Sequence, residues 1–206
     1  MYQPRLFREE DRERLHDLID RNPFGTLIVV APGGALEIAH VPVLLDRDVA
    51  RTGKDRLLLH VAAANPIWKA ALAAGQVVVV FAGPHAYVSP TWYEHPTEQV
   101  PTWNYAVVHA HGTPTKLDGD ELVRVLDDLV AAYEGRTADS WRVSPAIRDE
   151  LVREIVGLSI EVTKLEGKLK LSQNRSETDR ARVVEGLRER ASAEDVALAD
   201  LMTSRT

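Results

Sequence analysis

The sequence predicts a mainly β fold with peripheral helices, built around an antiparallel barrel. Short segments rich in β-branched residues are separated by turn signals, as where Pro32-Gly-Gly34 joins the segments 26–31 and 36–45 into a hairpin. Only one short helical segment, 67–74, falls among the early strands. A doubly wound parallel sheet needs a helix between most of its strands, so an antiparallel arrangement is favoured.

The remaining elements follow from periodicity and from local breakers. Leu122, Val125 and Leu129 lie on one face of a helix, while Asn22-Pro23 ends the first helix and Gly75 ends the second. Without an internal repeat or linker, we expect one domain over residues 1–206. The expected helices are 8–21, 67–74, 118–133, 144–156, 176–190 and 193–202, and the expected strands are 26–31, 36–45, 56–61, 77–81, 87–93, 105–114 and 158–165, with mobile loops at 46–55 and 94–99.

Composition narrows the function classes. The chain has 206 residues, 45% of them hydrophobic, and no cysteine, which excludes disulfides, thiolate chemistry and iron–sulfur clusters. The formal net charge of −6 argues against a broad nucleic-acid surface. The N-terminus lacks an apolar signal segment, and the most apolar run, 76–81, is too short to span a bilayer. We therefore expect a soluble cytoplasmic protein with no membrane partner.

Two neighbouring segments carry aromatic and polar side chains where a plain core would carry aliphatic ones. Trp92 and Tyr93 end the first segment, and Trp103 and Tyr105 lie in the second, although the whole chain has only four tryptophans. Flat rings beside polar groups suit a flat, partly polar ligand. The later segment 170–175 adds cations and amides. Together these segments predict a cofactor pocket.

Several residues could serve an anion or a heterocycle, and each also has a plain structural interpretation. Asn65 and Lys69 lie at a predicted helix start, where free amides attract anions, but such a lysine is usually solvated. Gln173 and Arg175 could bind a ring edge or a phosphate, or could satisfy a loop. Paired histidines in the strand 105–114 lack a third metal ligand. We find no nucleophile elbow, Walker loop or dinucleotide fingerprint.

Three segments are specific enough to suggest a family. They are Gly83-Pro-His-Ala-Tyr-Val-Ser89, Val100-Pro-Thr-Trp-Asn-Tyr105 and Lys170-Leu-Ser-Gln-Asn-Arg175. Shorter matches, His40-Val-Pro42 and His60 with the following Asn-Pro, stand in the same order. On these segments the chain resembles, over nearly its whole length, the PaiB family of FMN-binding negative transcriptional regulators.

The resemblance implies a split β-barrel of the FMN-binding, pyridoxamine-phosphate oxidase-like type, followed by C-terminal helices at about 176–203. It implies FMN rather than FAD, a homodimer with the cofactor at the subunit interface, and negative regulation of transcription with DNA as a possible partner. The alternative is a flavin-dependent oxidoreductase or a haem-handling protein on the same barrel, so enzymatic activity stays open.

The same resemblance implies a set of cofactor-binding residues and no catalytic or metal-binding residue. The strand around His40 would run along the flavin ring, and the segment from His60 to Lys69 would hold the phosphate. Residues near Trp103 and in the segment 170–175 would come from the partner subunit or close the ring edge. The full set is His40, Val41, His60, Val61, Asn65, Lys69, Ser89, Trp103, Asn104, Gln173 and Arg175.

Overall fold

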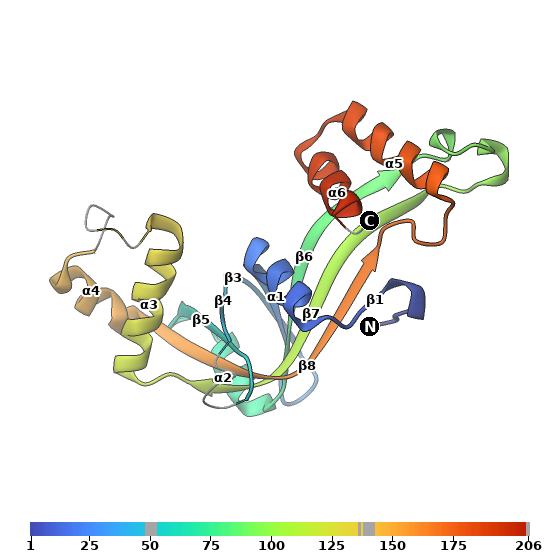
Figure 1. Cartoon of the computed structure of the whole chain (residues 1–206). Coiled ribbons are helices and arrows are strands. Elements are labelled where there is room, and N and C mark those ends of the chain that lie inside the picture. The colour runs from blue at the N-terminus through green and yellow to red at the C-terminus, as the bar shows by residue number, and fades with distance from the viewer. Residues whose placement is uncertain (48–52, 136, 138–142, 205–206) are drawn as a thin grey trace. The chain divides into compact units, whose positions relative to one another are not determined.

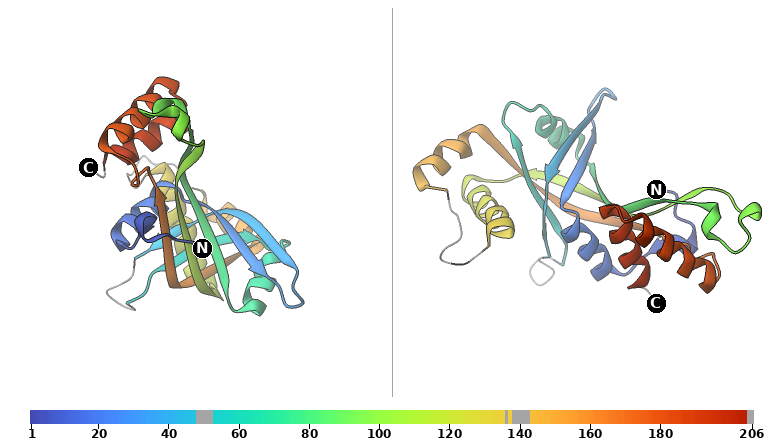
Figure 2. Two further views of the ribbon diagram at one scale, coloured as in Figure 1. Left: turned by 90° about the vertical axis from the view of Figure 1, so that its right-hand side faces the viewer. Right: turned by 90° about the horizontal axis from the view of Figure 1, so that it is seen from above.

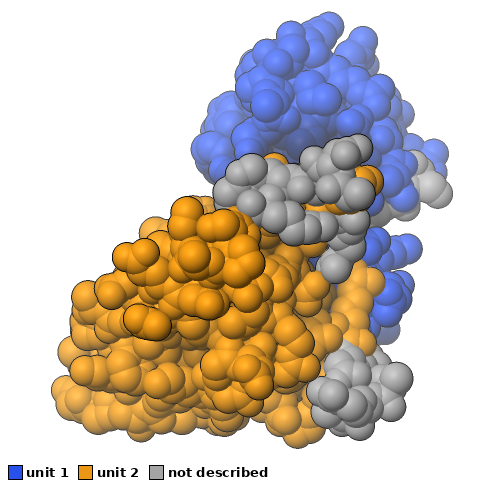
Figure 3. Space-filling model, turned by 90° about the vertical axis from the view of Figure 1, so that its left-hand side faces the viewer, with its two compact units in different colours: residues 1–21, 82–109, 166–206 blue, residues 22–81, 110–165 orange. Residues whose placement is uncertain are grey.

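The computed structural model describes residues 1–47, 53–135, 137 and 143–204. Part of the expected loop 46–55 lies outside these residues. The chain forms two compact units, coloured separately in Figure 3. Unit 1 comprises residues 1–21, 82–109 and 166–206, and unit 2 comprises residues 22–81 and 110–165.

The expected mainly β class with peripheral helices is confirmed (Figure 1). An antiparallel sheet follows the order β3-β2-β6-β7-β8-β5-β4, and β1 pairs with β8. This path has two ends among the described residues, so the sheet is open where the strand pattern predicted a barrel. The strands are β1 (Arg8–Glu9), β2 (Phe24–Val30), β3 (Leu36–Pro42), β4 (Leu44–Asp46), β5 (Arg56–Ala62), β6 (Val77–Val88), β7 (Thr102–Lys116) and β8 (Ile155–Lys170).

In unit 2 the β2–β3 hairpin forms as the sequence predicts. Gly33 and Gly34 both have positive φ, which the tight turn requires and other residues rarely adopt. Side chains alternate along β2, with Leu27 and Val29 buried and their neighbours turned outward. The hairpin register pairs Thr26 with His40 and Ile28 with Ile38.

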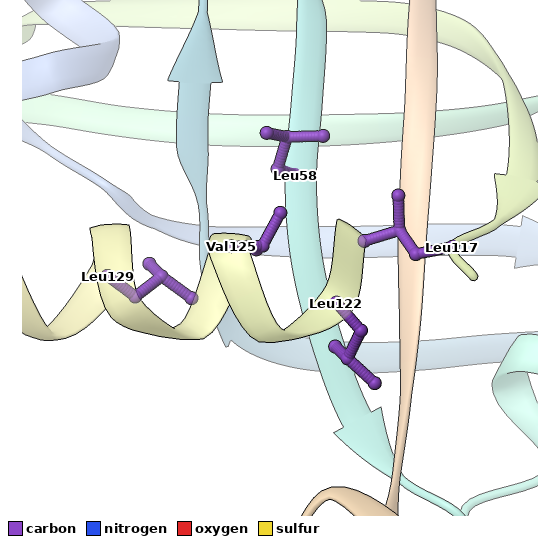
Figure 4. Close-up of a cluster of buried hydrophobic side chains, with 5 residues drawn as sticks. All are labelled: Leu58, Leu117, Leu122, Val125 and Leu129. Carbon is purple, nitrogen blue, oxygen red and sulfur yellow. The ribbon is translucent and has the colours of Figure 1, made fainter. Parts of the chain in front are cut away.

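Three helices and a 3-10 turn are described in unit 2. Helix α2 (Ile67–Ala74) ends at Gly75 in the left-handed conformation, and α3 (Gly119–Glu134) begins at the side-chain cap of Asp118. Figure 4 shows the apolar side of α3 against β5 and the end of β7. This side forms a buried cluster of Leu58, Leu117, Leu122, Val125 and Leu129. The shorter helix α4 (Pro145–Leu151) and a 3-10 turn, Val152–Glu154, follow where one helix over 144–156 was expected.

Unit 1 contains α1 (Arg12–Arg21), α5 (Glu177–Arg190) and α6 (Ala193–Thr203), together with 3-10 helices at Arg5–Phe7, Pro90–Trp92 and Pro96–Glu98. Helices α5 and α6 lie side by side, as both views in Figure 2 show. Ser192 begins α6 with a capping box, and Arg190 forms a salt bridge with the buried Asp195. No helix in the described part of the chain is long and apolar enough to cross a membrane.

Candidate functional site

His40 lies on β3 within unit 2, and its ring is exposed. Its Nδ1 atom is 3.0 Å from Thr26 Oγ1, and its ring stacks on Phe24 with the centroids 6.3 Å apart. Among the described residues no partner contacts its other ring nitrogen, so that nitrogen is free to meet a ligand. Val41 is buried on the opposite side of the strand. Only His40 of this predicted pair presents its side chain outward.

The outer side of this hairpin is apolar and open, and we call it the β2–β3 face. Cross-strand pairs in the register place its residues on one side of the hairpin. Phe24, Val30, Leu36 and Ile38 are each more than half exposed on it. Contiguous exposed apolar patches of this kind mark interaction surfaces. The apolar members of the face are Phe24, Ile28, Val30, Leu36 and Ile38, and the cross-strand pair of Thr26 and His40 lies on the same side.

His60 and Val61 point to opposite sides of β5, so their side chains do not share one ligand surface. Val61 is buried. His60 is partly buried, and its Nδ1 atom has no hydrogen-bond partner among the described residues. Burial lowers the pKa of His60 and favours the neutral ring. A buried, unpaired ring nitrogen is costly, and a ligand hydroxyl or phosphate oxygen would satisfy it.

The start of α2 gathers two ammonium groups around one indole ring. Asn65 uses its side-chain oxygen to accept from Ile67 N at 3.0 Å, so it caps the helix. Lys69 Nζ lies 5.2 Å from the Trp68 ring centroid, and Lys116 Nζ lies 5.5 Å from it. Neither lysine forms an ion pair with any described carboxylate. Two cations without an ion pair beside one ring, one from α2 and one from the end of β7, suit a phosphate.

Lys116 was absent from the sequence prediction. It ends β7, far along the chain from Lys69, and no local motif marks it. Only the fold brings the two lysines to the same indole ring.

The predicted residues of unit 1 divide into those whose polar groups already form hydrogen bonds within the fold and those whose side chains remain exposed. Asn104 is buried and donates to Ser172 Oγ at 2.9 Å. Gln173 bonds back to the main chain at Leu169 and Leu171. Ser89 accepts from Thr91 N and begins the 3-10 helix Pro90–Trp92. Each of these three polar groups therefore already serves the fold.

Arg175 already contacts two side chains of unit 1, whereas the Trp103 ring is largely exposed. The Arg175 guanidinium lies 4.7 Å from the Tyr93 ring centroid and donates to Gln99 Oε1. Trp103 is 53% exposed on β7 and packs edge-on against Tyr87, with the ring centroids 6.2 Å apart. Trp103 is thus the predicted aromatic that remains available for stacking in unit 1.

The eleven predicted residues fall into both units. The six from His40 to Lys69 belong to unit 2, and the five from Ser89 to Arg175 belong to unit 1. Among the residues the structure covers, no three His, Asp or Glu side chains gather as a metal site would require.

Comparison with known proteins decides the family. Residues 1–164 match the family model described as "Putative FMN-binding domain". The chain is 33% identical over 208 residues to the protease synthase and sporulation protein PAI 2 of Bacillus subtilis, covering 100% of this chain and 98% of that protein. The chain belongs to the PaiB-type FMN-binding family. Its cofactor is FMN.

Solved structures place the PaiB-type chain among split barrels. A FAD- and haem-binding protein of Mycobacterium smegmatis superimposes with a TM-score of 0.63 at 19% identity, covering 84% of this chain and 78% of that one. The flavocytochrome Anf3 of Azotobacter vinelandii gives 0.63 at 15% identity, covering 85% and 75%. At such identities the likeness concerns the fold alone.

The donor groups of the PaiB-type chain fit the chemistry of FMN. A phosphate needs cations, and in unit 2 Lys69 and Lys116 are two lysines without an ion pair to a described carboxylate. A flat heterocycle needs an exposed ring surface, and in unit 1 the Trp103 ring is 53% exposed. The unpaired nitrogen of His60 can meet a polar group of the cofactor.

Proposed function

We propose that this protein is a cytoplasmic FMN-binding regulator that acts as a homodimer, with the cofactor at the subunit interface. The observation that carries the dimer is the uncharged β2–β3 face, which exposes four large apolar side chains. The family resemblance supports negative regulation of transcription, with DNA as the partner. When bound, FMN supplies a ring that accepts and returns electrons.

A second copy of the chain is the occupant that best suits the β2–β3 face. A two-fold interface brings the same patch of both subunits together, so charged patches would repel and uncharged ones would not. The face carries no Asp, Glu, Lys or Arg, and β3 is an end strand of the sheet. Burying its apolar side chains against their own copies removes them from water.

The residues of unit 2 have distinct roles toward the cofactor in this proposal. Lys69 and Lys116 bind the phosphate, and the neutral His60 ring exchanges a hydrogen bond with a cofactor oxygen. Thr26 holds the His40 ring at one nitrogen and leaves the other to bond the flavin. Cofactor bound at the interface then favours one dimer geometry, and this change is the signal passed to a partner.

The test uses two matched isoleucines. Ile38 lies on the β2–β3 face and is 54% exposed, whereas Ile147 lies on α4 and is 52% exposed. Ile38→Lys places two like charges across the interface, so we expect its dimer dissociation constant to rise at least about tenfold, because like charges repel. Ile147→Lys should match the wild type. The measurement is sedimentation equilibrium with and without FMN.

The outcomes separate the parts of the proposal. An Ile38→Lys variant that dimerises like the wild type would rule out this face as the interface. A wild type that stays monomeric with FMN would refute the dimer itself. Rapid bleaching of bound FMN by NADH or NADPH would instead favour the oxidoreductase alternative.

A further inference from the structure

Unit 1 exposes aromatic rings and cations on one side of β6, β7 and β8. Trp103 is flanked by Tyr87 and by His85, whose ring centroid is 6.3 Å away. Tyr105 lies two residues further along β7, and so on the same side of the strand. We call these four residues, His85, Tyr87, Trp103 and Tyr105, the aromatic face.

Two lysines of β8 border this face. Lys168 Nζ lies 5.4 Å from the Tyr105 ring centroid and 5.6 Å from that of Tyr2. Lys170 Nζ donates to Trp103 O at 2.7 Å and to Thr102 Oγ1. The Trp103 carbonyl and the Thr102 hydroxyl therefore hold the Lys170 ammonium at the border of the aromatic face.

No described carboxylate forms an ion pair with the lysines that border the aromatic face, and the carboxylate of Glu194 lies 3.8 Å from His85 Nδ1. Neither Lys168, Lys170 nor Arg175 forms an ion pair with a carboxylate in the described ranges. Burial, and then the like charges of Lys168 and Arg175, lower the pKa of Lys170. Neighbouring cations repel one another, so a bound anion would relieve an existing cost.

The cluster combines a flat apolar platform with unpaired cations, which suits a planar aromatic anion. Two-electron reduction with uptake of one proton converts the neutral flavin ring into such an anion at neutral pH. The oxidised ring is equally flat but carries no charge. Cations beside the ring therefore distinguish the two states, whereas the indole does not.

We propose that the aromatic face binds the flavin ring, and that Lys170, assisted by Lys168, selects its reduced, anionic form. The proposal rests on the FMN binding proposed above and adds a preference for one redox state of the flavin. It concerns the side chains of unit 1 alone. Because binding and reduction are linked, tighter binding of the reduced ring makes bound FMN easier to reduce than free FMN.

The test compares dissociation constants for oxidised FMN and for FMN reduced anaerobically with dithionite. Lys170→Met removes the charge and keeps the length of the side chain, and Lys170→Arg keeps the charge. We expect Lys170→Met to reduce the preference for reduced FMN about tenfold, the size of one charge-assisted hydrogen bond. Lys170→Arg should retain most of that preference.

Further variants distinguish the loss of a flavin contact from the loss of the folded structure. Lys168→Met removes a cation that makes only ring contacts, so it should lower the preference without unfolding the chain. Trp103→Leu should weaken binding of both redox states alike, because the indole contacts the ring and not its charge. Lys164→Met, at an exposed position on the same strand, is the matched control and should change neither constant.

Riboflavin, which has no phosphate, shows whether the lysines bind the reduced flavin ring or the phosphate of FMN. If the lysines contact the ring, the effect of Lys170→Met on redox preference persists with riboflavin. If Lys170→Met weakens both redox states of FMN equally and leaves riboflavin unaffected, the lysines bind the phosphate and the proposal is overturned. A wild type that binds no flavin refutes the proposed function itself, which is a distinguishable result.

Discussion

Removal of the two lysines around Trp68 is the perturbation that tests the phosphate site most sharply. Lys69 and Lys116 are both exposed, and each ammonium lies within 5.5 Å of the indole ring centroid. A charge-assisted hydrogen bond to a phosphate contributes about 1.5–3 kcal/mol, but solvent screening at exposed lysines reduces this to about 1 kcal/mol each. We therefore expect about a fivefold loss of FMN affinity for each alanine variant.

The double variant should lose about 2 kcal/mol, or about thirtyfold in affinity. The assay is quenching of FMN fluorescence at fixed ionic strength, repeated with riboflavin. Riboflavin binding should be unchanged, and the affinity of the wild type for FMN should fall more steeply with salt than that of the double variant. Equal losses for FMN and riboflavin, or no loss for either, would refute the assignment of these lysines to the phosphate.

Three further predictions concern stability and pH. Leu122→Ala in the buried cluster should lower the free energy of unfolding by about 2–5 kcal/mol in urea titrations, and a loss below about 1 kcal/mol would contradict its packing role. The hydrogen bond from Arg190 lowers the pKa of Asp195 from 3.8 to about 2. The ionised Asp195 therefore contributes its full stabilisation above pH 4 and loses it as the pH falls toward 2. Asp195→Asn should flatten the acid unfolding curve in that range. Burial lowers the pKa of His60 below 6.5, so stability should fall as pH drops below 6.5, and His60→Phe should remove that slope in chemical unfolding at several pH values.

Local sequence patterns predicted the hairpin and most helices well, but the expected helix 8–21 begins only at Arg12, because Arg8 and Glu9 form β1 and pair with β8. The expected helix 118–133 appears as Gly119–Glu134, and the expected helices 176–190 and 193–202 appear almost unchanged. These elements carry caps and a regular apolar period, which depend only on neighbouring residues. The hairpin likewise follows from its glycine turn.

One error arose where distant residues decide the structure. Strand β8 was expected over 158–165 but spans Ile155–Lys170. Gly157 and Gly167 resemble strand breakers, yet a Cβ at Gly157 would lie 2.7 Å from Leu122, and one at Gly167 would lie 2.1 Å from Leu15. Their role is close packing, which no local pattern reveals.

The expected strand 87–93 was also wrong. Strand β6 runs unbroken to Val88, and the chain then enters the 3-10 helix Pro90–Trp92. The cap formed by Ser89 and the proline after it end the strand, and both were visible in the sequence.

The candidate site was predictable in part. Exposed side chains such as Trp103 and Lys69 remain available, whereas Asn104 and Gln173 are engaged by partners that only the fold reveals. The β2–β3 face did leave a signal in the sequence, since β2 is apolar on both of its sides. That pattern marks a strand covered on both sides, and here the second cover is the proposed partner subunit.

The most direct test of the account is to incubate the purified protein with FMN, remove the excess, and record the absorption spectrum together with the molar mass by light scattering. We predict retained flavin bands at about one FMN per chain, on a particle with the mass of a dimer. A colourless protein that also fails to quench FMN fluorescence would contradict the account.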